Sequence, residues 1–327
     1  MARARPNDPS AAGIGTVDGS LGVALPSSAQ GLLPDEFASM ELGAGGSGGR
    51  PSRANRIRAI LRAADLWIPA TMVILMILAC FVWPEIYPLR NPTKGVLANA
   101  NLPPFSRGYL LGADTLGDDV LSRILYGGRT SLEVGFASNA LGLIIGGTLG
   151  TVAGYLGGIV ESVVMRIIDM FLAFPALVLA LVIVTYLGAS ELHLIWAIAF
   201  FGVPAYARLA RAQSLRTREL NFILAARLSG TPHLRIVRRH IARNVLPGLL
   251  TFACLGIAIA IFVESALSFL GLGVPAPAPS WGNMIALGQT YLASNPYLII
   301  VPSAFLFVTV LSLNLLGDAL RARWAER

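Results

Sequence analysis

Residues 134–160 read V-G-F-A-S-N-A-L-G-L-I-I-G-G-T-L-G-T-V-A-G-Y-L-G-G-I-V, and this stretch decides the fold class. It contains no charged residue and exceeds the roughly 20 residues that an α-helix needs to cross a bilayer core. Glycine recurs every four residues along it, which on a helix forms a flat stripe where a second helix can approach closely. We therefore expect a membrane-spanning helix with packing glycines at Gly142, Gly146, Gly150, Gly154 and Gly158.

The remaining sequence extends this reading to the whole chain. Of the 327 residues, 55% are hydrophobic and only 13% are charged, against roughly 25% charged in a soluble domain. A water-soluble globular protein is excluded, and the mean hydropathy of +0.66 indicates an all-α integral membrane protein. Together with residues 134–160, five further uncharged runs predict six transmembrane helices: Trp67–Trp83, Met170–Ser190, Leu192–Ala207, Val245–Val263 and Leu298–Gly317.

The positive charge has a clear distribution along the chain. The formal net charge is +7, and Lys94 is the only lysine, so the other basic residues are arginines. Cytoplasmic loops of membrane proteins carry an excess of Lys and Arg. Arginines gather before the first span, in the 208–243 loop and after the last span, so we expect both termini and this loop in the cytoplasm. This pattern accounts for the basic excess without nucleic acid. The nine loop arginines are Arg208, Arg211, Arg216, Arg218, Arg227, Arg235, Arg238, Arg239 and Arg243.

These observations predict a division of the chain into five parts. They are a disordered cytoplasmic tail at 1–50, a basic juxtamembrane segment with the first span at 51–86, an external segment at 87–130 that ends in a short amphipathic helix, a five-helix core at 131–320 with a cytoplasmic loop at 208–246, and a cytoplasmic tail at 321–327.

Residue patterns for catalysis or metal binding are not found in the sequence. Lys94 precedes a glycine, so there is no G-x-x-x-x-G-K-[ST] phosphate loop, and the three histidines lack H-E-x-x-H spacing. No serine lies in G-x-S-x-G. Asp114, Asp118 and Asp119 lack calcium-loop spacing, and we expect a solvated helix face there. We expect neither an active site nor a metal site nor a cofactor in this chain.

The segment 224–247, L-A-A-R-L-S-G-T-P-H-L-R-I-V-R-R-H-I-A-R-N-V-L-P, predicts two short helices joined by a tight turn. Gly230 suits a left-handed helix end, and Thr231 followed by Pro232 suits an N-cap and a first helical position. Leu234 and Ile241 are expected on one face. A basic connector could lie on anionic lipid headgroups. An ordered, capped turn is more than a connector needs, so docking on a cytoplasmic partner is the favoured interpretation.

This segment resembles the "EAA" loop of permease subunits of bacterial ABC importers, which docks on the ATPase subunit. Ala225, Ala226, Gly230, His240, Ile241 and Pro247 fall on the family pattern, whereas Leu224 replaces the usual Glu and His233 a small or acidic residue. The resemblance implies that the following residues form the ATPase-coupling loop: Ala225, Ala226, Gly230, Thr231, Pro232, His233, Leu234, Arg235, Arg238, His240 and Ile241.

Four other segments, at 111–132, 165–176, 264–273 and 279–284, resemble dipeptide, oligopeptide and nickel permeases. The resemblance covers about residues 56–325 and is greatest to the "C" permease of a peptide importer. It implies type I ABC importer permease architecture, an inner-membrane location and a heterodimer with a B-type permease. It also implies two cytoplasmic ATPase subunits that bind ATP and Mg²⁺, and an external substrate-binding protein. Peptides are the favoured cargo, with nickel, glutathione and haem as alternatives.

Glu264 and Ser265 are candidate residues of the transport pathway or its gate. Glu264 follows Pro247 by 17 residues, roughly 26 Å along a helix. An acid at such a position is a functional candidate, although it could equally reach water or pair with backbone. A secondary transporter or channel is the alternative class; it predicts ionisable residues near the bilayer centre and an internal repeat, and neither is evident. Arg166 and Asp169, three residues apart, are expected to form a local ion pair.

Overall fold

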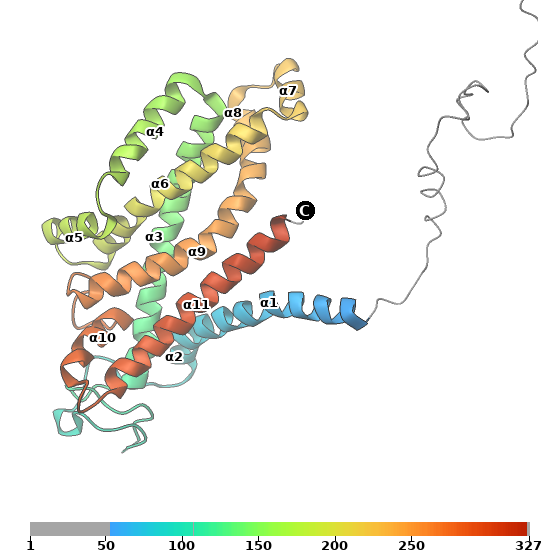
Figure 1. The fold of residues 1–327 in the computed structure, drawn as a ribbon. Helices are drawn as coiled ribbons and strands as arrows, with labels where there is room; N and C mark the ends of the chain where they lie inside the picture. The colour runs from blue at the N-terminus through green and yellow to red at the C-terminus, as the bar shows by residue number, and fades with distance from the viewer. Residues whose placement is uncertain (1–52, 107, 326–327) are drawn as a thin grey trace, which may run out of the picture. The chain divides into compact units, whose positions relative to one another are not determined.

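The computed structural model describes residues 53–106 and 108–325, and the statements on structure concern these residues (Figure 1). The predicted tail at 1–50 lies outside them. The chain divides into two units after Arg56, and the unit from Ile57 onward holds the helices discussed below. Its regular structure is helical, with two isolated β-bridges between residues 106 and 119, so the predicted all-α class is confirmed.

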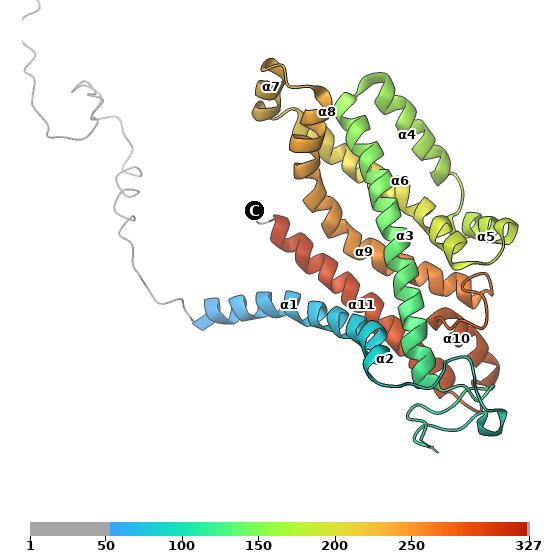
Figure 2. The same cartoon turned by 180° about the vertical axis from the view of Figure 1, so that it is seen from behind.

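The helices follow one another along the chain with short connections (Figures 1 and 2). Short 3₁₀ turns occur at Leu97–Asn99 and Gln289–Tyr291. The main helical elements are α1 Arg53–Ile77, a π-helical turn Leu78–Val82, α2 Trp83–Ile86, α3 Val120–Leu156, α4 Gly158–Leu172, α5 Ala176–Leu187, α6 Glu191–Arg218, α7 Asn221–Leu228, α8 His233–Ile236, a π-helical turn Val237–Ile241, α9 Ala242–Phe269, α10 Trp281–Gly288 and α11 Tyr297–Ala325.

Five helical stretches of the described chain are long and apolar enough to cross a membrane, and a bent pair makes up to six. The predicted straight span at Met170–Ser190 is wrong. The chain instead forms α4 and α5, which meet at an angle of 84°. Pro175 lies at the break, with an extended backbone that starts α5 anew. Pro204, by contrast, lies within a continuous α6.

The boundary predicted between the external segment and the core also moves. Residues 120–130 are not a separate amphipathic helix, because α3 runs unbroken from Val120 to Leu156. Asp119 caps its first turn by accepting a hydrogen bond from the Ser122 amide at 3.0 Å. The residues from Tyr87 to Asp119 form an irregular segment before this cap.

The glycine stripe of α3 packs directly on α6, the most extensive helix pair of the unit. A Cβ atom at Gly146 or Gly150 would fall inside the carbonyl oxygens of Val203 and Ala207 on α6. The contact is completed by Ser214 Oγ, which donates to the Thr151 carbonyl at 2.9 Å. The predicted packing role of the glycines at 142, 146, 150 and 154 is therefore supported by the geometry.

Gly158 does not belong to this stripe. The backbone turns at Gly157, which has φ +69° and ends α3, and Gly158 begins α4 with φ +57°. A Cβ atom at Gly158 would meet nothing within 4 Å. The four-residue period continues through the sequence, but the helix ends before its last member.

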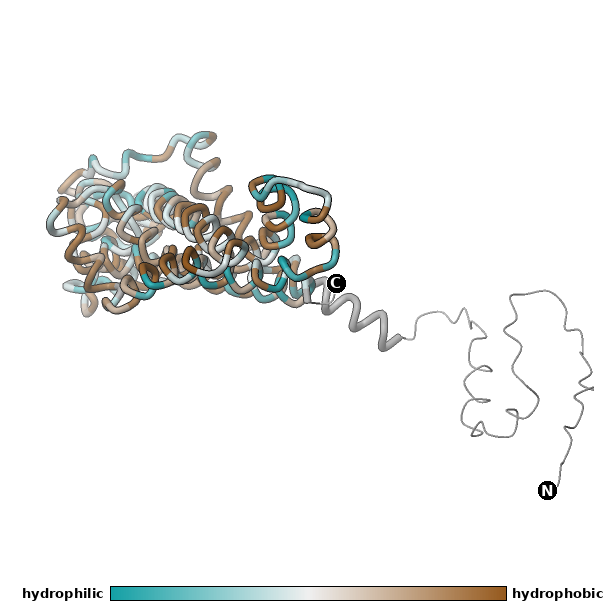
Figure 3. The backbone as a smooth tube through the Cα atoms, turned by 90° about the horizontal axis from the view of Figure 1, so that it is seen from above, coloured by the Kyte–Doolittle hydropathy of each residue, from teal (hydrophilic) through white to brown (hydrophobic). Residues whose placement is uncertain are grey.

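The long helix α9 lies against α3, α6, α10 and α11, and so joins the elements of the unit. Fully buried Trp281 at the start of α10 fills the space beside α3 and donates from Nε1 to the Ile124 carbonyl at 3.0 Å. Figure 3 shows hydrophobic stretches along the helices of this unit, interrupted by hydrophilic residues. Outward-facing apolar side chains on these helices fit a lipid environment.

The glycine contact gives a first prediction. Gly150→Ala should lower the stability of the purified protein by about 1–3 kcal/mol, because the added methyl group cannot fit against the Ala207 backbone. Gly147→Ala is the matched control on the other face of α3, where the new Cβ meets only the flexible end of Leu249 at 3.1 Å. Thermal unfolding in detergent measures both, and equal midpoints for the two variants would contradict the packing role.

Candidate functional site: the connector between α6 and α9

The segment from Glu219 to Ile241, here called the connector, leaves the bundle after α6 and returns to it as α9 (Figure 1). It consists of α7, a turn at 229–232, α8 and a π-helical turn. The predicted pair of short helices with an ordered turn is thus present. The second helix is not isolated, because α8, the π-helical turn and α9 follow one another without a break.

The turn after α7 is a Schellman motif, in which two backbone bonds close a helix end. The Thr231 amide donates to the Ala226 carbonyl at 3.1 Å, and the Gly230 amide donates to the Arg227 carbonyl at 3.0 Å. Gly230 has φ +71°, so the predicted left-handed position is confirmed. This turn fixes the direction of the chain between the two helices.

The start of α8 differs from the prediction by one residue. Pro232, with an extended ψ of 143°, is the N-cap, and His233 is the first helical residue. Thr231 makes no capping bond to α8, and its amide instead closes the turn after α7. The Schellman motif therefore uses the residue that the sequence pattern assigned to the next helix.

The buried face of α8 also differs from the expected one. Leu234 is 79% exposed, whereas Ile236 and Ile241 are fully buried. The π-helical turn at Val237–Ile241 adds one residue to the helical period, so side chains five apart point the same way. Ile236 and Ile241 then join Ile223 of α7 in one core cluster.

Tyr155, near the end of α3, fixes both arms of the connector. Its hydroxyl lies 2.8 Å from His233 Nδ1 on α8. The Arg227 guanidinium of α7 lies over its ring at 5.0 Å, a cation–π contact. Arg218 donates to the Gly154 carbonyl at 3.0 Å beside it. The sequence gave no signal for Tyr155, because it is one of many apolar positions in an uncharged run.

The outer surface of the connector is apolar at its tip. Leu228 is 90% exposed, and with Leu234 it presents two large apolar side chains away from the bundle. The other predicted coupling residues lie in the same segment. Ala226, Thr231 and His240 are half-buried, Ile241 is buried, and the remainder are exposed: Ala225, Gly230, Pro232, His233, Arg235 and Arg238. An exposed apolar tip on an ordered turn is suited to docking.

Glu264 and Ser265 lie on α9, away from the connector, and the Glu264 side chain is fully buried. Ser268 Oγ donates to Glu264 Oε1 at 2.7 Å, and Ser265 Oγ donates to Oε2 at 3.1 Å. The Ser131 and Ser280 hydroxyls face the same carboxyl group. Serine oxygens in this cluster also accept backbone bonds from Val274, Trp281 and Asn283. The carboxyl group thus organises the loop between α9 and α10; its role in a pathway stays a prediction.

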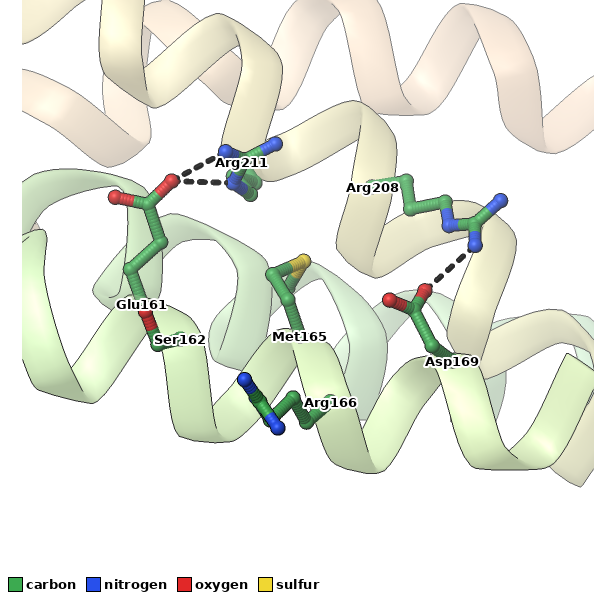
Figure 4. A pocket seen from close by; sticks show the side chains of 7 residues that line it. All are labelled: Glu161, Ser162, Met165, Arg166, Asp169, Arg208 and Arg211. Carbon is green, nitrogen blue, oxygen red and sulfur yellow. Dashed lines mark hydrogen bonds and ion pairs between the residues drawn. The ribbon is translucent and has the colours of Figure 1, made fainter.

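A charged groove of about 580 Å³ lies between α4 and α6 (Figure 4). The predicted ion pair between Arg166 and Asp169 is not formed. Asp169 Oδ1 instead accepts from Arg208 Nη2 of α6 at 2.6 Å, and Glu161 pairs with Arg211 Nε at 2.6 Å. Figure 4 shows Arg166 pointing away from both pairs. The acidic residues of α4 thus bind α6 rather than their own helix.

The acidic residues before α3 are not a solvated helix face. Asp118 is 3% exposed and pairs with Arg123 Nη1 at 2.6 Å, and Asp119 caps α3. Asp114 lies 3.4 Å from Arg123 Nε. Burial raises the pKa of the Asp114 carboxyl group, and the nearby Arg123 charge opposes this rise. No group of three metal-binding side chains occurs within residues 53–106 and 108–325.

The geometry defines a multi-span membrane protein with a docking connector, and comparisons with known proteins agree with this class. Residues 146–327 match the family described as "Binding-protein-dependent transport system inner membrane component". The chain is 37% identical over 261 residues to the dipeptide transport system permease protein DppC of Alkalihalophilus pseudofirmus, which covers 80% of this chain and 84% of that protein.

Other relatives and a solved structure are similar to this chain over comparable lengths. The glutathione transport system permease protein GsiD of Pectobacterium atrosepticum is 37% identical over 78% of this chain and 84% of its own length. A chain of the MetNI methionine ABC transporter, in an inward-facing conformation, aligns with a TM-score of 0.51, 20% identity and coverage of 61% of this chain and 95% of its own. This likeness shows the fold, a type I ABC importer permease.

The chain therefore belongs to the family of inner-membrane components of binding-protein-dependent transport systems. It is a multi-pass permease subunit of an ABC importer. In this family the permease is not catalytic, and ATP hydrolysis is carried out by separate subunits.

The serine cluster gives a prediction for Glu264. Glu264→Ala should lower stability by about 1–3 kcal/mol, because the buried hydroxyls lose their acceptor, whereas Glu264→Gln keeps an amide oxygen in the same place. Glu191→Ala, at the partly exposed start of α6, is the control and should change stability by less than about 1 kcal/mol. Thermal unfolding and transport are measured on each. A stable Glu264→Gln protein that does not transport would support a pathway role beyond this structural one.

A further prediction concerns the connector. Tyr155→Phe removes the bond to His233 but keeps the ring under Arg227, so the fold should persist. Losing about 1 kcal/mol should speed hydrogen exchange of the amides at 231–236 roughly fivefold. Tyr186→Phe is the control, because the Tyr186 side chain is 86% exposed. Unchanged exchange at 231–236 would show that Tyr155 does not hold the connector.

Proposed function

We propose that this chain is the C-type permease of an importer that carries di- or oligopeptides across the cytoplasmic membrane. The observation that carries the proposal is the ordered connector, held at its base by Tyr155 and apolar at its exposed tip. Such a segment is suited to transmit movement from a docked partner to the helices on which it rests.

The connector is the proposed contact with the ATPase. Leu228 and Leu234 extend outward from α7 and α8 and would fill an apolar groove of a partner. The half-exposed Leu224, at the position where relatives usually have Glu, adds apolar rather than charged surface. ATP and Mg²⁺ would be bound by two ATPase subunits, since no phosphate loop exists in this sequence.

The rest of the assembly follows from the same proposal. A B-type permease would pair with this chain, and an external binding protein would deliver cargo at the end of the bundle formed by the 87–119 segment. The arginines of the connector place it, with both termini, on the cytoplasmic side. Nucleic acid has no part in this assembly.

The mechanism uses two states of the permease pair. Closure of the ATPase subunits would move the docked connector, and the bond between His233 and Tyr155 would pass that movement to α3. The helices would then change from an inward-facing to an outward-facing arrangement. Each ligand shifts this equilibrium only by its difference in affinity for the two states.

Peptides are the cargo best supported by the relatives, since several carry names of dipeptide transport systems. Glutathione is the second candidate, because the GsiD protein of a glutathione transport system is equally similar to this chain. Nickel or haem import, and a secondary transporter or channel, are the remaining alternatives. The binding protein is expected to decide among the cargoes.

The first experiment isolates the tagged full-length chain from its native membrane in a mild detergent. Mass spectrometry should find a second permease, ATPase subunits and a binding protein, and the eluate should hydrolyse ATP. The binding protein is then tested with dipeptides, oligopeptides and glutathione. A chain recovered alone, with no ATPase activity, would favour the secondary transporter.

The exposed tip gives the prediction for coupling. Leu228→Asp should leave the fold intact, because the side chain is 90% exposed, but weaken ATPase attachment by about 2 kcal/mol or more, roughly thirtyfold. Co-purification of the ATPase and cargo uptake in proteoliposomes measure the effect. Leu116→Asp, at a 55% exposed leucine of the 87–119 segment, is the matched control. Normal uptake in the Leu228→Asp variant would remove the tip from the docking surface.

A further inference from the structure

A second surface of the connector lies beside the docking tip and has a different chemistry. A groove of about 770 Å³ runs between α3 and the π-helical turn with the first part of α9. Figure 2 shows α3 beside α8 and the start of α9. Its walls include Ile144 of α3 and Leu246 of α9, and Gly147 leaves space between them. The groove therefore follows the middle of the uncharged 134–160 run into the membrane.

The interior of this groove is apolar even where threonines line it. Thr148 Oγ1 donates to the Ile144 carbonyl of its own helix at 2.7 Å. Thr151 Oγ1 donates in the same way to the Gly147 carbonyl at 2.6 Å. With their hydroxyls bonded to backbone, both residues offer methyl groups to the groove. A peptide would find few polar partners there, whereas an acyl chain would find a matching wall.

Three arginines stand where the groove reaches the connector: Arg238, Arg239 and Arg243. All three are exposed. No acidic residue occurs between Glu219 and Glu264, so their own segment supplies no counter-charge. Arg208 and Arg211 of α6, by comparison, are paired with acids of α4. The groove therefore joins an apolar channel to a concentrated positive charge.

We propose that this groove binds an anionic phospholipid, with its phosphate on these three arginines and one acyl chain along Ile144, Gly147 and Leu246. Basic pockets between spanning helices are suited to anionic headgroups. The planar, multi-donor guanidinium matches phosphate oxygens better than an ammonium group does. A bound lipid would bridge α3 and the connector beside Tyr155, on a surface separate from the Leu228 tip.

The experiment uses the full-length chain with its co-purifying subunits. Native mass spectrometry measures retention of phosphatidylglycerol against phosphatidylcholine with the same acyl chains. The wild-type protein should retain phosphatidylglycerol selectively. Replacing Arg238, Arg239 and Arg243 together by Gln should reduce this retention on the order of a hundredfold, since each arginine near the headgroup contributes roughly fivefold. Arg235→Gln is the matched control, because Arg235 is exposed on α8 outside the groove and should leave retention unchanged.

A second variant tests the groove without changing charge. Gly147→Leu fills the space between the walls and should also release phosphatidylglycerol, while size-exclusion chromatography verifies the fold. Retention by Gly147→Leu together with loss in the arginine variant would mean surface electrostatics alone, and would overturn the site. Competition by glycerol 1-phosphate would assign a free-phosphate site instead. Loss of a co-purifying subunit with unchanged lipid would assign the arginines to a protein contact.

Discussion

The close contact between α3 and α6 is the constraint on which the rest of the structure depends. Glycines at 146 and 150 let the two backbones meet, so that Val203 and Ala207 lie where side chains of α3 would otherwise be. The same contact brings the end of α6 to the end of α3, where Arg218 bonds to the Gly154 carbonyl. The connector begins from this fixed point, and its position is therefore set by backbone contact.

The two ends of α3 carry the two polar arrangements that matter most. At one end, Ser131 faces the buried Glu264 carboxyl group and accepts a bond from the Trp281 amide. At the other, Tyr155 contacts both arms of the connector. A buried polar group is stable only when its partners are in place, so each arrangement holds neighbouring segments in one geometry. Rigid α3 joins these arrangements, which makes it the natural element for transmitting movement.

Local patterns predicted the spans, the docking segment and the Gly230 turn, because hydropathy and φ requirements are properties of short stretches. The errors came where a partner distant in sequence or a change of helix type decides. Asp169 pairs with Arg208 of α6 instead of Arg166 on its own helix. The π-helical turn buries Ile236 and leaves Leu234 exposed, which a period of 3.6 cannot show. The family resemblance supplied the coupling role, and no periodicity pointed to Tyr155.

The arginine excess of the connector also has a physical division of labour. Topology alone requires positive charge near the membrane and is satisfied by lysine or arginine alike. This chain uses arginine at every basic position except Lys94. Arginine binds through several donors in one plane and stacks on aromatic rings, as Arg227 does on Tyr155. Those properties serve specific contacts rather than orientation, and they separate an arginine-lined lipid groove from a leucine docking tip on the same short segment.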